Sequence, residues 1–392
     1  MRMVDAMSRL GTETAFEVLA RAAALDAAGG VNGRRVINLG IGQPDFPTPE
    51  HVVEAAVKAL RDGAHGYTPA QGIPPLREAV SRDLAARAGA EIPAERIVIM
   101  PGGKPTMFFA CLMFGAPGTE ILYPDPGFPI YGSMARFSGA AAVPVPLRAE
   151  DGFALNADEI LKRLTPRSRL LIVNSPGNPT GGVAPKSEID KLVAGLADWP
   201  EVAILSDEIY SRLLYDGREH VSLASYPEIA DRLILLDGWS KTYAMTGWRL
   251  GWSAWPASLV ETVVRLCVNN HSCVNAATQH AGIAALEGPQ DAVETMRAAF
   301  DARRRAIVRF SNALPGVSCV EPGGAFYAFP DVSGTGLDGK TLQTRMLEEA
   351  GVAAVAGTSF GQAAPHCVRF SYANSLENIE EALDRVARLL NA

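Results

Sequence analysis

Several features that would mark this 392-residue chain as secreted, membrane-bound or metal-binding are missing from it. Its five cysteines are scattered and odd in number, and none forms a C-x-x-C pair. Neither a disulfide framework nor a zinc site is therefore indicated. No uninterrupted apolar run approaches the roughly 20 residues needed to span a bilayer, and the N-terminus lacks the apolar core of a signal peptide. We expect a cytoplasmic protein with reduced thiols and no metal.

An excess of positive charge is also missing. The net charge is −7, so no electrostatic footprint for nucleic acid or for an anionic membrane is present. Nothing before Leu39 is long or basic enough to form a DNA-binding domain. Hydrophobic residues make up 48% and charged residues 20% of the chain, which is typical of a soluble globular protein. A small anionic substrate remains compatible with these numbers, because local arginines override the global charge.

The length favours two domains. Amphipathic helices are predicted over residues 51–62 and 75–88. Short apolar runs bounded by Gly, Pro, Asp or Ser follow at residues 96–100, 120–123, 170–174, 202–206, 233–236 and 250–254. Strands that alternate with helices indicate a mostly parallel, doubly wound sheet covered on both faces.

The last part of the chain has a different pattern. A long charged helix is predicted over 291–314, strands over 324–329 and 367–371, and a closing helix over 376–390. This pattern indicates a smaller α/β domain joined by the N-terminal arm. We therefore predict a large domain at 46–290, and a small domain made of 1–45 and 291–392.

One segment carries the most chemical information: Gly238-Trp-Ser-Lys-Thr-Tyr-Ala-Met-Thr-Gly-Trp-Arg-Leu-Gly251. It places Lys241 among small and hydroxyl residues, with Arg249 eight positions further on. A lysine amine can form a Schiff base with an aldehyde cofactor, and a nearby arginine can bind that cofactor's phosphate. Taken alone, Lys241 could equally be an ordinary surface lysine.

The segment resembles the cofactor-lysine segment of pyridoxal-phosphate-dependent aminotransferases of class I/II, the aspartate aminotransferase family. Matching segments follow in the family's order along almost the whole chain. The resemblance implies the fold of type-I pyridoxal-phosphate transferases, a homodimer with shared active sites, and pyridoxal 5'-phosphate held by Lys241 as a Schiff base.

Two further segments are expected to contact the cofactor ring. Asp207 follows the run at 202–206, and active sites of open α/β sheets lie at the carboxyl ends of strands. The resemblance implies that Asp207 pairs with the pyridine nitrogen, while Tyr210 and Asn178 donate to the phenolic oxygen. Asn178 lies in the rigid turn Asn174-Ser-Pro-Gly-Asn-Pro-Thr-Gly181. Without the resemblance, these residues would be a helix cap, a packing residue and a turn residue.

A phosphate site is expected in Pro101-Gly-Gly-Lys104, between a strand and a helix. Backbone N–H groups at a helix N-terminus bind anions, and Gly102 and Gly103 allow a close approach. In some relatives a lysine at the position of Lys104 meets a distal substrate carboxylate. This chain continues with Pro105-Thr106 where most relatives have a glutamine and a small residue, so the role of Lys104 stays open.

A second departure concerns the phosphate. Many relatives carry a serine three residues before the lysine, where this chain has Gly238. Ser240 offers a hydroxyl next to the lysine. Binding of the cofactor phosphate is expected to rely more on Arg249, backbone amides and Tyr67. The resemblance implies that Tyr67 reaches the phosphate of the neighbouring subunit, which makes the dimer necessary.

Three more residues are implied by the resemblance. Phe128, in Tyr123-Pro-Asp-Pro-Gly-Phe-Pro-Ile-Tyr131, matches the aromatic residue that stacks on the cofactor ring. Arg369 matches the arginine that clamps the substrate α-carboxylate through a two-point fork. Gly40 matches a backbone contact to the same carboxylate. A core phenylalanine and a surface arginine are the alternatives for the first two.

The expected reaction is transfer of an amino group from an L-amino acid to a 2-oxo acid such as 2-oxoglutarate, with Lys241 moving the α-proton. Aspartate or another dicarboxylate is the leading donor, and alanine, aromatic and branched-chain amino acids remain open. A β-elimination lyase would use the same residues. A regulatory module that only binds the cofactor is a further alternative of another class.

Overall fold

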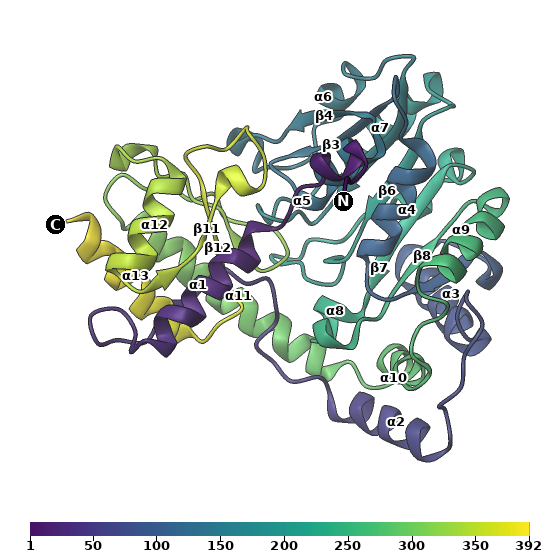
Figure 1. Cartoon of the computed structure of the whole chain (residues 1–392), viewed down its shortest axis with the longest axis horizontal. Helices are drawn as coiled ribbons and strands as arrows, with labels where there is room; N and C mark the ends of the chain where they lie inside the picture. The colour runs from purple at the N-terminus through teal and green to yellow at the C-terminus, as the bar shows by residue number, and fades with distance from the viewer. Residues whose placement is uncertain (392) are drawn as a thin grey trace.

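The computed structural model describes residues 1–391, and a seven-stranded sheet forms the centre of the molecule (Figure 1). Its spatial order is β2-β8-β7-β6-β5-β3-β4. The strands are β2 (Ile97–Met100), β3 (Glu120–Asp125), β4 (Ala141–Pro146), β5 (Ser168–Asn174), β6 (Ala203–Asp207), β7 (Leu233–Gly238) and β8 (Gly251–Ala254). β8 is antiparallel to both β2 and β7, whereas the other neighbouring pairs are parallel. All six predicted runs are strands of this sheet.

The edge strand β4 was not predicted from the sequence. Its sequence, Ala-Ala-Val-Pro-Val-Pro, contains two prolines, which weaken the strand signal. β4 pairs only with β3 within the sheet, so proline nitrogens on its outer side break no ladder. A lone edge position therefore tolerates a sequence that a central strand would not.

Helices cover both faces of the sheet. α4 (Lys104–Phe114), α5 (Pro129–Ser138) and α9 (Ala257–Asn270) pack on one face. The other face is covered by α3 (Pro74–Ala88), α6 (Ala157–Leu161), α7 (Lys186–Gly195) and α10 (Ala276–Glu287), and α2 (Glu50–Arg61) packs against α10. In β5, Leu170 and Ile172 face the first group while Leu171 and Val173 face the second, which is the alternation of a strand buried on both sides. The predicted doubly wound α/β fold is confirmed.

The strands that run in the same direction bring their carboxyl ends to one edge of the sheet. Because β8 is antiparallel to both neighbours, β2 runs the same way as β7. The segments that follow β2, β3, β5, β6 and β7 therefore meet at this edge, including the one-turn helix α8 (Trp239–Thr242) that carries Lys241. This edge is where ligands bind in open α/β sheets.

The N-terminal arm and the last hundred residues form a second group of elements, on the left in Figure 1. It contains α1 (Thr14–Ala27), β1 (Ile37–Asn38), α11 (Asp291–Asn312), β9 (Tyr327–Ala328), α12 (Gly339–Glu349), β10 (Val352–Ala353), β11 (Val355–Ala356), β12 (Val368–Ser371) and α13 (Leu376–Leu390). β1 pairs with β10 in parallel, and β12 lies between β11 and β9 with antiparallel pairing. The strand predicted over 324–329 is only two residues long, because Ala325 has φ +57°, which breaks the extended backbone before it.

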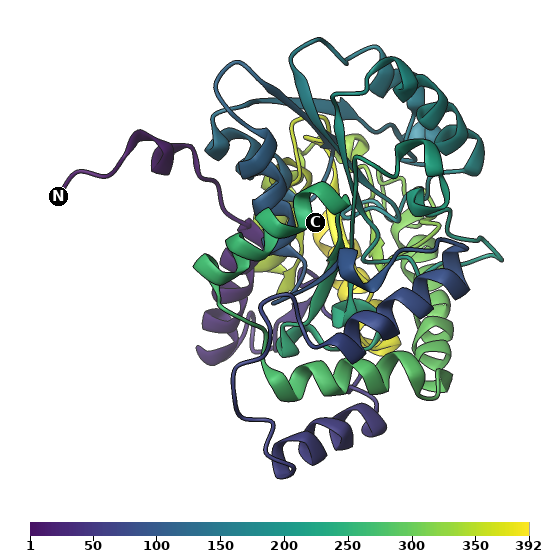
Figure 2. The same ribbon diagram turned by 90° about the vertical axis from the view of Figure 1, so that its right-hand side faces the viewer.

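The chain begins with a short 3-10 helix, η1 (Asp5–Arg9), on a segment that extends outward from the body in Figure 2. The arm is bound to α5 at two points: Arg9 Nε donates to the carbonyl oxygen of Arg136 over 2.9 Å, and the N–H of Gly11 donates to Ser133 Oγ over 2.8 Å. It therefore passes across the carboxyl edge of the sheet on its way to α1. No helix within residues 1–391 is long and apolar enough to cross a membrane.

Candidate active site

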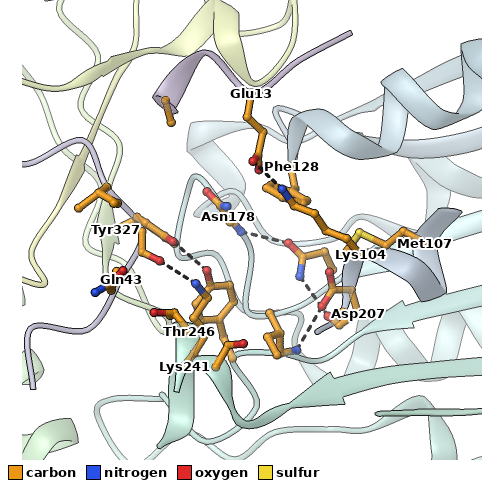
Figure 3. A pocket seen from close by; sticks show the side chains of 18 of the residues that line it. Glu13, Gln43, Lys104, Met107, Phe128, Asn178, Asp207, Lys241, Thr246 and Tyr327 are labelled. Carbon is orange, nitrogen blue, oxygen red and sulfur yellow. Dashed lines mark hydrogen bonds and ion pairs between the residues drawn. The ribbon is translucent and has the colours of Figure 1, made fainter. Parts of the chain in front are cut away.

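A cavity of about 500 Å³ lies at the carboxyl edge of the sheet. Its wall combines the ends of the parallel strands, the N-terminal arm and the C-terminal strands β9 and β12. Ten of the predicted site residues line it: Gly103, Lys104, Phe128, Asn178, Asp207, Tyr210, Ser240, Lys241, Arg249 and Arg369. Figure 3 shows this convergence from segments far apart in the sequence.

Lys241 lies at the floor of the cavity, in α8 directly after β7. Its Nζ donates to the carbonyl oxygen of Gly42 over 2.6 Å. Burial, together with the positive charge of Arg369, lowers the pKa of Lys241 from 10.5 to about 8. A larger share of the amine is therefore neutral near pH 7 than for a surface lysine, and only the neutral amine is a nucleophile.

Asp207 ends β6 and is 2% exposed. Its Oδ2 accepts from the Tyr131 hydroxyl over 2.6 Å, and its Oδ1 accepts from the N–H of Ile209 over 3.2 Å. Burial raises the pKa of Asp207 to about 6, although these two hydrogen bonds oppose the rise. A carboxylate desolvated in this way gains most from a cationic partner in the cavity.

Tyr131 was not assigned from the sequence. It occupies the first turn of α5 three residues after Phe128, a spacing that puts both on one side of the helix. That spacing was the available signal. Phe128 also lines the cavity, and its ring centroid lies 5.7 Å from that of Tyr131 in an edge-on arrangement.

Tyr210 is joined to Tyr327, a second residue that the sequence did not single out. Their hydroxyl oxygens are 2.8 Å apart, and both side chains are buried. Burial, with the neighbouring Tyr327, raises the pKa of Tyr210 well above 10. Both hydroxyls therefore keep their protons for hydrogen bonding. A Cβ at Gly42 would lie 2.2 Å from the Tyr327 hydroxyl, so glycine is required where the arm passes.

Arg369 is 3% exposed and lies between the rings of Tyr327 and Phe360, at 4.5 and 4.7 Å. Its Nη1 donates to Asn178 Oδ1 over 2.8 Å, and its Nη2 to the carbonyl oxygen of Gly40 over 2.5 Å. Its buried Nε has no hydrogen-bond partner within residues 1–391. Gly40 itself does not line the cavity and instead supports Arg369. A buried guanidinium with donor capacity left fits a carboxylate ligand.

The N-terminus of α4 borders the cavity through Gly103 and Lys104, whereas Gly102 does not line it. Gly102 has φ +83°, a backbone conformation that L side chains rarely adopt, and a Cβ there would lie 2.2 Å from Nη2 at the end of the Arg249 side chain. Arg249 is held by a 2.7 Å bond from Nη1 to the carbonyl oxygen of Thr246. Pro105 occupies the first turn and has no N–H, so the helix end offers one donor fewer than usual.

The glycine at position 238 has a steric cause. A Cβ there would lie 2.8 Å from the Cα of Gly251 in the paired strand β8 and 3.1 Å from the Leu250 carbonyl oxygen. This backbone therefore has no room for a serine at 238. The hydroxyl that lines the cavity beside Lys241 is that of Ser240, which is 9% exposed.

Tyr67 is the predicted site residue that lies farthest from this arrangement. It is 94% exposed and does not line the cavity of its own chain. It borders a second hollow together with His65, Cys273 and Asn275. Any contact between Tyr67 and a phosphate therefore requires the cavity of another subunit.

Glu13, from the N-terminal arm, closes the cavity opposite α4. Its Oε2 lies 2.7 Å from Lys104 Nζ. The same ammonium lies 5.6 Å from the ring centroid of Phe16 and 5.7 Å from that of Phe128. No local sequence pattern predicts this pair, because 91 residues separate its members.

The sheet order and the position of Lys241 directly after β7 match the predicted type-I transferase fold. The family model for class I and II aminotransferases matches residues 34–386, and the chain belongs to this family. Members of the family use pyridoxal phosphate. The resemblance and the assignment as an aminotransferase are thereby confirmed.

Individual relatives cover almost the whole chain. An aspartate aminotransferase of Pyrococcus abyssi is 39% identical over 93% of this chain and 94% of its own. An aromatic-amino-acid aminotransferase of Thermococcus litoralis is 40% identical with the same two coverages. The structure of the Thermus thermophilus aspartate aminotransferase with maleate superposes with a TM-score of 0.93 at 35% identity, over 99% of this chain and 100% of that one.

Proposed function

We propose that the cavity transfers the amino group of L-aspartate, or of another dicarboxylic L-amino acid, to a 2-oxo acid such as 2-oxoglutarate. The observation that carries this proposal is the placement of Lys241, Asp207 and Arg369 around one cavity. Asp207 and Arg369 are buried, Lys241 is partly buried, and each has a perturbed pKa. The Pyrococcus and Thermus relatives named as aspartate aminotransferases support aspartate as donor.

The residues of the cavity fit pyridoxal 5'-phosphate. Arg249, Ser240 and the N-terminus of α4 would hold the phosphate, with Gly102 and Gly103 giving it access. Lys241 would hold the aldehyde carbon covalently, and Asp207 would face the ring nitrogen. When bound, the cofactor withdraws electrons from the substrate's α-carbon. The steric fit of Gly102 to Arg249 supports a close approach of a phosphate at this point.

The protein's own groups divide the remaining work. Arg369 binds the substrate α-carboxylate, with its orientation fixed by Asn178 and Gly40. The Nζ of Lys241, once free, takes the α-proton and returns it as a general acid–base. Asp207 keeps its negative charge facing the ring, held in place by Tyr131.

The rest of the cavity orients the ring. Tyr210 and Asn178 would donate toward its phenolic oxygen, and Phe128 would pack on its face. Tyr210 is in turn fixed by its 2.8 Å contact with Tyr327.

Transfer from aromatic amino acids is a second candidate. The Thermococcus relative is named for it, and Phe16 and Phe128 both line the cavity near Lys104. An aromatic side chain would pack on these rings without using the Lys104 ammonium. The two candidates therefore differ in how they use one end of the cavity.

Assembly and location complete the proposal. The exposed Tyr67 supports a homodimer in which it reaches the partner's phosphate site. We propose the domain boundaries at 45/46 and 290/291, supported by an apolar cluster that is built mainly from β1, α11, α13 and the C-terminal strands and that Tyr210, Leu213 and Tyr215 of the large domain also join. Four buried free cysteines support a reducing compartment such as the cytoplasm.

Product analysis tests the proposed reaction. The purified protein with pyridoxal phosphate is supplied with L-aspartate and 2-oxoglutarate, and oxaloacetate and glutamate are measured. Formation of both in equal amounts, only when the oxo acid is present, is the expected result. In a second assay L-serine, which carries a leaving group on its β-carbon, is supplied without any oxo acid. Release of pyruvate and ammonia there would instead make the protein a lyase.

A further inference from the structure

We infer that Glu13 sets the substrate specificity of this site by occupying the ammonium that a second substrate carboxylate would use. This inference rests on the proposed function, because it names which substrates the same cavity prefers. As long as the substrate has no distal carboxylate, the Glu13 carboxylate pairs with the Lys104 ammonium in its place. A dicarboxylic substrate therefore binds Lys104 only by displacing Glu13.

The geometry places the pair inside the cavity. Glu13 Oε2 lies 2.7 Å from Lys104 Nζ, and both residues line the cavity wall. The Glu13 side chain is 11% exposed and that of Lys104 is 46% exposed. Figure 3 shows Glu13 reaching from the N-terminal arm to the Lys104 ammonium beside Phe128. The contact therefore occupies ligand space rather than an outer surface.

The charges of the cavity wall show why this pair matters. Arg249 is assigned to the phosphate, Lys241 to the aldehyde and Arg369 to the α-carboxylate. Lys104 is the remaining cation among the lining residues, and Glu13 neutralises it. A second substrate carboxylate at this end of the cavity meets the negative charge of Glu13 before it meets a usable positive charge.

The site is built so that the exchange can occur. Lys104 begins α4 and lies within 6 Å of the Phe16 and Phe128 rings, which keep the ammonium in place when its partner leaves. Glu13 precedes α1 at the end of the arm, and within residues 1–391 its carboxylate makes this one ion pair. A neutral substrate side chain leaves the pair intact.

The test is a comparison of half-reactions in the holoenzyme. The second-order rate constant for loss of the visible cofactor band is measured with L-aspartate and with L-alanine, in each case without a 2-oxo acid acceptor. Glu13→Gln is expected to increase this value for L-aspartate about threefold to tenfold, the range of a partly exposed ion pair. The value for L-alanine is expected to change by less than about twofold.

Two control variants separate the local effect from general charge. Glu17→Gln removes the same charge from the first turn of α1, four residues after Glu13, where Glu17 is exposed and does not line the cavity, and is expected to change neither rate. In a Lys104→Gln background, Glu13→Gln is expected to lose its selective effect on L-aspartate. The inference is overturned if Glu13→Gln has the same effect on the L-aspartate rate constant with and without the Lys104→Gln substitution. It is also overturned if Glu13→Gln leaves the ratio of the L-aspartate and L-alanine rate constants unchanged.

A binding measurement keeps this test separate from the proposed function. Titration calorimetry of the purified protein with succinate and with butyrate compares a dicarboxylate with a matched monocarboxylate, neither of which can react. Glu13→Gln is expected to lower the Kd of succinate about threefold to tenfold and to leave that of butyrate unchanged. If no amino acid reacts but succinate behaves this way, the proposed function fails and the role of Glu13 stands. If aspartate reacts but Glu13→Gln does not change the ratio of the Kd values for succinate and butyrate, the inference alone fails.

Discussion

The Tyr131 hydroxyl donates to Oδ2 of Asp207 over 2.6 Å, and both groups are buried between α5 and the carboxyl end of β6. The bond fixes the carboxylate in the plane that faces the cavity. It also stabilises the charged form of Asp207 against the desolvation that raises its pKa to about 6. The two residues come from segments 76 positions apart, and the packing of α5 on the sheet brings them together.

Replacing the Asp207 carboxylate should lower activity without lowering the stability of the fold. In the cofactor-free protein the pKa of Asp207 is raised from 3.8 to about 6, so its cost to folding grows as pH rises from about 4 to 6 and is complete above that. This cost amounts to about 3 kcal/mol at most. Asp207→Asn should therefore leave the apoprotein at least as stable at pH 7, while kcat falls about a hundredfold to a thousandfold. Denaturant unfolding and steady-state kinetics measure the two effects.

Tyr131→Phe is the matched control for this prediction. It removes the hydrogen bond but keeps the charge, so the cofactor should bind more weakly by about tenfold while activity at saturating cofactor largely remains. A Tyr131→Phe variant as inactive as Asp207→Asn would contradict the assignment of Tyr131 as a positioning residue.

The pKa of Lys241 predicts how the apoprotein takes up pyridoxal phosphate. Because burial lowers that pKa to about 8, the neutral amine increases as pH rises toward 8 and is nearly complete above 9. The second-order rate of growth of the visible cofactor band should rise with pH and level off with a midpoint near 8. A rate still rising at pH 10 would show that Lys241 titrates like an exposed lysine.

Replacing each of two arginines of the cavity should change a different constant. Arg369→Ala should raise KM for amino acids about a hundredfold, because a buried two-point carboxylate contact is lost. Its affinity for pyridoxal phosphate should change little. Arg249→Ala should weaken cofactor binding and leave KM nearly unchanged once the cofactor is saturating. Measuring both constants in both variants checks the assignment, and a reversed pattern would exchange the two roles.

Much of the fold could be predicted because local patterns carried it. The six buried runs, the helices α2 and α3, and the closing helix α13 all have clear apolar spacing, and the structure has each within two residues of the expected bounds. The edge strand β4 was missed because its prolines hide the strand pattern. Ala325 shortened a predicted strand through a backbone angle that its residue type does not indicate.

The site residues also fall into those that a local sequence pattern predicts and those that it does not. Lys241, Asp207 and Arg369 lie in segments with strong sequence signals, and all three line one cavity. Tyr327 and Glu13 have no local signal, because what places them is the packing of the C-terminal strands and of the N-terminal arm against the large sheet. Contacts between such distant segments become visible only in three dimensions.

The absorption spectrum of the purified protein before and after addition of excess L-aspartate tests the central claim most directly. A visible band from the lysine-bound cofactor should disappear while a near-ultraviolet band of the amine form grows, and Lys241→Ala should lack the visible band. A visible band that does not respond to L-aspartate would move the substrate elsewhere. Absence of any band after addition of pyridoxal phosphate, or a normal band in Lys241→Ala, would contradict the account of the site.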